Sequence, residues 1–252
     1  MAPPAQLLGS LPIATGPVTD YTRWLEREES RWKPSHTSAG QNFSLECYRH
    51  PDRKFYIGTK AVLPIKAPLA TVEKVFDTVS GYKEIFFGFD EIALSGKTDE
   101  GFVVHWHRPV PVFFIPDLRY EVVYRNVKSP GRKTYRFQMK EKVDLLKGLD
   151  GMIVLEAVDA NTTLLTQFLF LDGKYGPLET FDPAKIWNDG VRDFSLANLG
   201  VKLQAENPAL ERAPLRAAIE KAYSDEQVKN CIATKTLHPG LKAGYENKGE
   251  TP

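Results

Sequence analysis

The sequence predicts an α+β fold in which a curved antiparallel sheet wraps around one long C-terminal helix. Between residues 91 and 171 apolar and polar side chains alternate, and turn-forming residues interrupt the pattern repeatedly, which is typical of successive antiparallel strands. A single long amphipathic segment, residues 184–205, follows. Because one helix alone cannot fill such a sheet, we expect an internal hydrophobic cavity.

The N-terminal part of the chain is expected to contribute an arm, a helix and two strands. Residues 1–18 are rich in proline, glycine and small side chains and predict a flexible arm. A Thr-Asp pair at positions 19–20 can cap a helix that ends near Pro34. Residues 43–49 and 55–65 have the apolar alternation of strands.

The middle of the chain predicts a short helix followed by six strands. Pro68 stands where a helix should begin, Val72 and Phe76 belong to its apolar stripe, and Gly81 ends it. The six strands are predicted at residues 91–97, 101–108, 117–127, 133–142, 151–158 and 163–171. They should form one antiparallel sheet without parallel crossovers.

The C-terminal part predicts the long helix and an appendage. The long helix begins after Pro183 and stops before Pro208, and a more polar amphipathic helix is expected at residues 210–223. The predicted organisation is a flexible arm at residues 1–18, a globular domain at 19–206, and a helical appendage and tail at 207–252.

The composition excludes several classes of protein. With 33 basic and 32 acidic residues the net charge is +1, so we expect no nucleic-acid partner. The two cysteines, Cys47 and Cys231, lack the spacing of a structural zinc site. No apolar run is long enough to cross a membrane. A signal peptide begins with a basic region, and no Lys or Arg precedes Arg23. We expect a soluble protein, either cytoplasmic or, if a signal peptide has been removed, periplasmic or secreted.

Motifs for metals and cofactors are weak. His105 and His107 share one face of a predicted strand, but a metal needs a third ligand that the sequence does not provide nearby, so ordinary strand histidines are favoured. Neither the nucleophile motif G-x-S-x-G nor a dinucleotide motif G-x-G-x-x-G follows a strand. We therefore predict no metal and no cofactor.

Several stretches resemble a StAR-related lipid-transfer (START) domain of the helix-grip superfamily, also called SRPBCC or Bet v 1-like. They are Trp32 followed by FSLECYRH at 43–50, KFYIGTKAVL at 54–63, HWHRPVPVFFIPDLRYEVVYR at 105–125, and TTLLTQFLFLDGKYGPL at 162–178. The resemblance covers about residues 20–206, with Arg119-Tyr120 where the family usually has Arg-Asp. It implies a helix-grip fold around an internal cavity.

The resemblance implies that the protein binds, and transfers, a lipid or other hydrophobic small molecule of the sterol, fatty acyl or isoprenoid type. The alternative is an enzyme of the same fold, a cyclase or dehydratase of polyketide-like substrates, with acid–base roles for Tyr120, Tyr124, His105 or Glu121. A third alternative is an interaction protein with a filled core that binds a partner through residues 209–252. We expect a monomer that contacts membrane surfaces transiently.

Alternation and helical spacing predict which side chains line the ligand site. They are Trp106, Tyr120, Tyr124, Arg125, Phe137, Met139, Phe168, Trp187, Val191 and Phe194. Tyr120 and Tyr124 share one face of their strand, and Arg125 lies on the other. Because burying charged side chains is unfavourable, this alternation favours the tyrosines facing the cavity. The resemblance instead implies that Arg125 lines the pocket and pairs with an acidic group or the ligand head, Glu121 being one candidate partner. Both alternatives remain open at this level.

Overall fold

The computed structural model of the protein describes residues 43–49, 56–98, 100–110, 115–173, 183–225 and 235–236. The strands are β1 (Ser44–Arg49), β2 (Tyr56–Ile65), β3 (Glu91–Thr98), β4 (Gly101–Arg108), β5 (Leu118–Ser129), β6 (Arg132–Met139), β7 (Leu146–Ala157), β8 (Thr163–Gly173) and β9 (Lys235–Thr236). The helices are α3 (Leu69–Asp77), the 3₁₀ turn η2 (Val79–Gly81), α4 (Tyr82–Ile85), α5 (Pro183–Glu206) and α6 (Arg212–Asp225).

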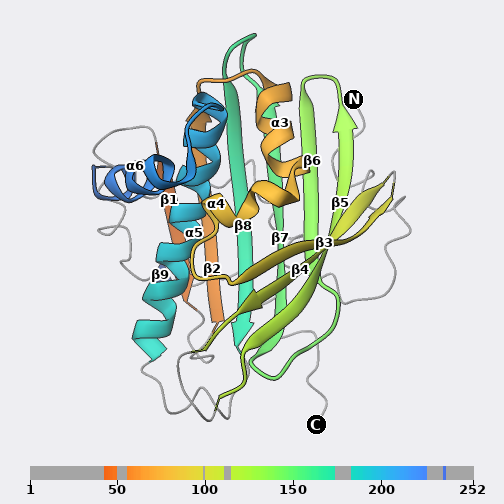
Figure 1. The fold of residues 1–252 in the computed structure, drawn as a ribbon, viewed down its shortest axis with the longest axis vertical. Helices are drawn as coiled ribbons and strands as arrows, with labels where there is room; N and C mark the ends of the chain where they lie inside the picture. The colour runs from red at the N-terminus through yellow and green to blue at the C-terminus, as the bar shows by residue number, and fades with distance from the viewer. Residues whose placement is uncertain are drawn as a thin grey trace.

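The described strands form one sheet in the order β3-β4-β5-β6-β7-β8-β2-β1-β9. Neighbouring strands are antiparallel, except that β9 runs parallel to β1. The sheet curls so that β3 and β4 cross the direction of β7 and β8 (Figure 1). Helix α5 packs against β2 and against α3, α4 and α6. The predicted α+β fold, a curved sheet around a long C-terminal helix, is confirmed.

Most predicted elements occur within two or three residues of their expected limits, and the largest difference is at β7. This strand begins at Leu146 rather than 151, because its first residues pair with the end of β8 despite Gly148 and an irregularity between Leu146 and Gly148. Strand β6 ends at Met139 rather than 142. The predicted arm and the predicted helix at 19–34 lie outside the described residues, and the domain limits stay a prediction.

The end of helix α5 is attached to the sheet by a small polar network. Lys202 Nζ donates to the carbonyl oxygen of Pro64 at 2.6 Å and to Glu206 Oε1 at 2.6 Å. The same Glu206 oxygen accepts the backbone N–H of Lys66 at 2.7 Å. Because Pro64 and Lys66 flank the end of β2, these bonds fix the helix across the sheet and position its buried face.

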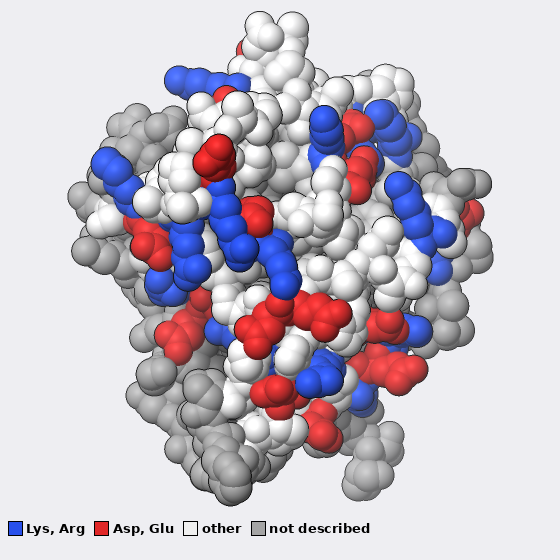
Figure 2. All heavy atoms as spheres, in the orientation of Figure 1, with Lys and Arg blue, Asp and Glu red and all other residues white. Residues whose placement is uncertain are grey.

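Charges of both signs are interspersed on the surface. Figure 2 shows Lys and Arg side chains alternating with Asp and Glu on the face seen in Figure 1. Pairs such as Arg212 Nε with Glu84 Oε2, at 3.0 Å, and Lys140 Nζ with Glu121 Oε2, at 2.8 Å, join neighbouring elements. Within the ranges given above, no helix has the length and apolar character needed to cross a membrane.

Candidate ligand-binding cavity

A cavity of about 150 Å³ lies between helix α5 and the concave face of the sheet. Its lining is predominantly apolar, and the aromatic members are Phe76, Tyr82, Phe86, Phe87, Phe89, Trp106, Tyr120, Tyr124, Phe137 and Phe194. Aliphatic side chains of β5, β7 and β8 complete the wall, and α5 contributes Gly190 and Ala197. A cavity of this composition offers an apolar ligand burial against aromatic and aliphatic side chains.

Trp106 occupies the centre of this aromatic lining. Its ring centroid lies 5.0 Å from those of Phe86 and Phe89, in edge-to-face geometry, and 6.4 Å from the stacked ring of Tyr120. Phe86 and Phe89 belong to the segment between α4 and β3, where Gly88 has a φ of 79°, a backbone conformation that glycine adopts without strain. The rings therefore fill much of the space that the sheet encloses.

One end of the cavity is polar. Arg108 Nη1, from the end of β4, donates to Asp193 Oδ2 of helix α5 at 2.7 Å, and the guanidinium lies 5.7 Å from the Phe89 ring centroid. Burial raises the pKa of Asp193, and the adjacent guanidinium partly opposes this shift. The pair is neutral overall, so it adds no net charge to an otherwise apolar space.

Further polar groups of the cavity wall come from Tyr120, Tyr124, Trp106 and Gln167. The hydroxyls of Tyr120 and Tyr124 make no hydrogen bond to the described residues, and burial raises the pKa of both phenols, so both stay protonated and can donate. Trp106 Nε1 is buried and likewise lacks a partner in the described part of the chain. A buried donor without a partner is costly, and a ligand oxygen could satisfy Trp106 Nε1 or accept from either hydroxyl.

Half of the predicted site residues line this cavity. Trp106, Tyr120, Tyr124, Phe137 and Phe194 do so, which decides the open alternative on β5 in favour of the tyrosine face. Met139 and Val191 are buried in the same core without lining the cavity. The side chain of Trp187 lies outside the described residues. Whether the lining residues bind a ligand stays a prediction.

The placement of Arg125 in the pocket is corrected. Arg125 lies on the opposite face of β5 from Tyr124, and its Nη1 is 3.6 Å from Glu100 Oε2. Glu121, the candidate partner, instead accepts a 2.8 Å hydrogen bond from Lys140 Nζ. Turning the charged face outward lets these side chains reach water and partners, because burying an unpaired charge costs far more than burying a tyrosine hydroxyl.

The placement of Phe168 is corrected as well. Gln167 and Leu169 line the cavity, so Phe168 faces away from it on the other side of β8. Its side chain is nevertheless fully buried, and the ammonium of Lys60, its cross-strand neighbour, lies 5.3 Å from the ring centroid. Because both faces of β8 bear buried aromatic or aliphatic residues, alternation could not tell the cavity face from the other.

Sequence reasoning missed the polar end of the cavity and part of its aromatic wall. Arg108 and Asp193 are 85 positions apart and share no motif, so only the folded chain brings them together. The wall residues Phe86, Phe87 and Phe89 had a visible signal, a cluster of aromatic residues around one glycine directly before β3. Such a cluster beside a predicted cavity is a reasonable candidate for its lining.

The two strand histidines have different surroundings. His107 Nε2 lies 3.0 Å from Asp117 Oδ2, and His105 pairs across the sheet with Glu121. The hydrogen bond with His107 lowers the pKa of Asp117. In the part of the chain that the structure describes, no group of three or more metal-binding side chains occurs.

Solved structures with this architecture were found by comparison. Human STARD10 is 13% identical over 88% of this chain and 86% of its own, with a TM-score of 0.50. A STAR-related lipid transfer protein from Xanthomonas axonopodis is 15% identical, over 75% and 98%, with a TM-score of 0.49. The Zhui aromatase/cyclase of a Streptomyces species is 14% identical, over 77% and 97%, with a TM-score of 0.40.

The likeness to human STARD10 concerns the fold alone, because only 13% of the residues are identical. No protein-family model and no curated protein matches the chain. The chain has the START-type helix-grip fold that the sequence resemblance predicted.

Proposed function

We propose that this protein binds a hydrophobic small molecule in the cavity beneath helix α5. The observation that carries the proposal is the aromatic lining, closed by one polar end where Arg108 pairs with Asp193. Apolar burial supplies affinity in such a site, and a few polar groups orient the ligand. The fold shared with human STARD10 is compatible with this role without specifying it.

The cavity volume favours a compact ligand. Drug-sized ligands occupy pockets of about 300–1,000 Å³, whereas an apolar cavity of roughly 150 Å³ is known to accommodate benzene. The volume here is about 150 Å³. A ligand with one ring and a short chain therefore fits without displacement of the wall side chains. A sterol, long acyl chain or isoprenoid requires displacement of wall rings, most readily Phe86 and Phe89, which belong to no helix or strand.

The polar end favours a neutral ligand head. Asp193 already forms an ion pair with the guanidinium of Arg108. A ligand carboxylate at this end would therefore be repelled by the Asp193 carboxylate. A hydroxyl or carbonyl oxygen can instead accept hydrogen bonds from Tyr120 or Tyr124 without adding charge. We therefore favour a neutral alcohol, phenol or ketone over a free acid.

A matched ligand series tests this proposal by calorimetric titration. We expect 4-propylphenol to bind more tightly than propylbenzene, and 4-propylbenzoate to bind most weakly. Phe137→Asp should abolish binding because it places a charge in the apolar wall, whereas Val158→Asp, at a site 63% exposed, should not. Ala197→Leu, which fills the cavity, provides a second variant if Phe137→Asp fails to fold. Absence of binding by all three compounds and by cholesterol, palmitate and farnesol would refute the proposal.

An enzyme of the same fold is the second candidate, and Asp193 is the observation that favours it. A carboxyl group with a raised pKa beside a guanidinium in a cavity is a candidate acid or base. His105 and Glu121, considered above for this role, do not line the cavity, whereas Tyr120 and Tyr124 do. Catalysed hydrogen–deuterium exchange of 2-tetralone, followed by NMR and lost in Asp193→Asn, would support the enzyme. Binding without exchange would favour the binding protein.

Transfer between membranes, transient membrane contact and the monomeric state remain predictions. Transfer is measured as movement of a fluorescent sterol or fatty acid between donor and acceptor liposomes. The membrane prediction is tested by co-sedimentation with anionic vesicles, and the oligomeric state by light scattering during size-exclusion chromatography.

A further inference from the structure

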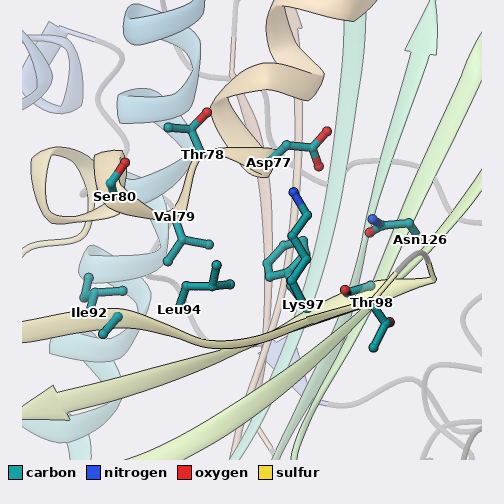
Figure 3. Close-up of a pocket in the computed structure, with 12 residues that line it drawn as sticks. Asp77, Thr78, Val79, Ser80, Ile92, Leu94, Lys97, Thr98 and Asn126 are labelled. Atoms are coloured by element: carbon teal, nitrogen blue, oxygen red, sulfur yellow. Dashed lines mark hydrogen bonds between the residues drawn. The ribbon is translucent and has the colours of Figure 1, made fainter.

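A second hollow lies outside the cavity beneath α5, between the end of α3, the turn η2 and the β3–β4 hairpin (Figure 3). Its volume is about 650 Å³, and it is an open groove that shares no lining residue with the cavity. Phe102 lines the groove and Tyr124 lines the cavity, and their rings stack with centroids 4.8 Å apart. The groove is therefore a separate site.

One half of the groove is apolar. Val79 and Leu94 face each other across it in Figure 3, and Ile92 and Phe102 complete this half. Leu94 is 49% exposed, although large hydrophobic side chains in the described residues are mostly buried. An irregularity of β3 between Leu94 and Gly96 interrupts its pairing with β4 at this point. An exposed leucine beside a hollow offers an apolar surface to a ligand.

The other half of the groove contains the exposed side chain of Lys97, which makes no ion pair with the described residues. The Lys97 side chain rises from β3 into the groove, with its ammonium directed toward the end of α3 (Figure 3). Asp77, the acidic residue of the lining, already accepts hydrogen bonds from Lys133 Nζ at 2.8 Å and from the Tyr135 hydroxyl at 3.0 Å. The negative charge of Asp77 is thus compensated by Lys133, whereas Lys97 has no ion-pair partner in the described part of the chain.

Asn126 adds an unsatisfied acceptor at the same end. Its Oδ1 is buried and lacks a hydrogen-bond partner in the described part of the chain, and Figure 3 shows the amide pointing into the groove. Its backbone N–H is fixed by a 2.8 Å bond to the Glu100 carbonyl oxygen. A buried acceptor without a partner is unfavourable, so a ligand hydroxyl that reaches Oδ1 after a small rotation of the Asn126 side chain would be stabilised.

We propose that this groove binds a small amphipathic monocarboxylate, with the carboxylate at Lys97 and the chain against Val79 and Leu94. A hydroxyl near the carboxylate would donate to Asn126 Oδ1 and increase the affinity. Charge complementarity decides the class of ligand, because the groove combines an apolar surface with an ammonium that no described residue pairs. The inference is independent of the cavity, whose polar end disfavours acids.

Decanoate, decanol and decyltrimethylammonium, each below its micellar concentration, are the probes. We expect decanoate to shift the backbone amide NMR signals of Val79, Leu94 and Lys97, and to bind about two- to fivefold more tightly than either other compound. 3-Hydroxydecanoate should bind more tightly than decanoate, and Asn126→Ala should remove this difference. Lys97→Gln should weaken decanoate binding about two- to fivefold. Lys142→Gln, a matched change at an exposed lysine beyond the end of β6, should not.

The amide signals separate the groove from the cavity. Decanoate that shifts Phe194 and Ala197 instead, with an affinity insensitive to Lys97→Gln, is bound beneath α5 and overturns the inference. Equal affinity for decanoate and decyltrimethylammonium also overturns it. Groove binding retained in Phe137→Asp, a cavity variant, would show that the two sites are distinct. Leu94→Ser tests the apolar half and should weaken the binding of all three probes by a similar factor.

Discussion

Lys133 Nζ lies 2.8 Å from Asp77 Oδ2, although Lys133 is only 6% exposed. The Tyr135 hydroxyl donates to the other Asp77 oxygen at 3.0 Å, and Glu73 Oε2 lies 3.9 Å from the same ammonium. These bonds join the end of α3 to β6. They hold Phe76 in the cavity wall, where its ring centroid lies 5.3 Å from that of Tyr135, and they neutralise the acidic side of the groove.

Asp77→Asn should therefore destabilise the protein more than Lys133→Met. The first change leaves a buried ammonium with a single, longer ion pair to Glu73 and should lower the free energy of unfolding by about 1–3 kcal/mol. The second removes the buried charge, while Asp77, 40% exposed, can be hydrated and Glu73 keeps its bond to Lys128. Urea unfolding of both variants measures the order, and a larger loss for Lys133→Met would contradict it.

Asp193 should titrate above its ordinary pKa of 3.8, because burial disfavours the carboxylate. Arg108→Gln should raise the pKa of Asp193 further, since the guanidinium favours the charged form. The folded protein then binds this proton more tightly than the unfolded chain. Its contribution to stability is therefore greatest below the unfolded pKa and declines as the pH rises through the folded pKa.

Carboxyl ¹³C NMR titration of the wild-type protein and Arg108→Gln measures the two pKa values of Asp193. Asp193→Asn serves as the control, because it should remove this component of the pH dependence of unfolding. A pKa of Asp193 that falls in Arg108→Gln would be inconsistent with the ion pair.

Gly151→Ala should destabilise the protein and distort the cavity. A Cβ at this position would collide with the Phe168 carbonyl oxygen and with the ring of Phe137, a cavity wall residue. Overpacking of this kind costs about 1–3 kcal/mol. Gly81→Ala is the matched control, because a Cβ there would meet no atom within 4 Å and the φ of Gly81 is −83°. Thermal unfolding compares the two, and equal melting temperatures would speak against the collision.

Trp106→Phe should be nearly neutral for stability. The substitution keeps an aromatic ring against Phe86 and Phe89 and removes an Nε1–H that lacks a partner in the described residues, so the lost volume is offset. Trp106→Ala should cost about 3–5 kcal/mol, because it leaves a large cavity. Denaturant unfolding distinguishes them. A loss in Trp106→Phe as large as that in Trp106→Ala would contradict this expectation.

The sequence by itself determined the order and type of most elements. Period-two alternation with intervening turns defined six strands, and Pro183 with the apolar face of the following segment defined the long helix. These signals are local, because strand and helix periodicity depend on which neighbouring side chains share a face. Together with short connections, they left the helix-grip arrangement as the natural way to bury those faces.

Only the tertiary structure decided which faces of the strands line the cavity and how large the cavity is. Alternation separates Tyr124 from Arg125 and Leu169 from Phe168. On β8, where both faces bear buried residues, it does not say which group lines the cavity. The volume is what remains after the rings around Trp106 have packed. The pairing of Arg108 with Asp193 likewise depends on where α5 crosses the sheet, which no local pattern encodes.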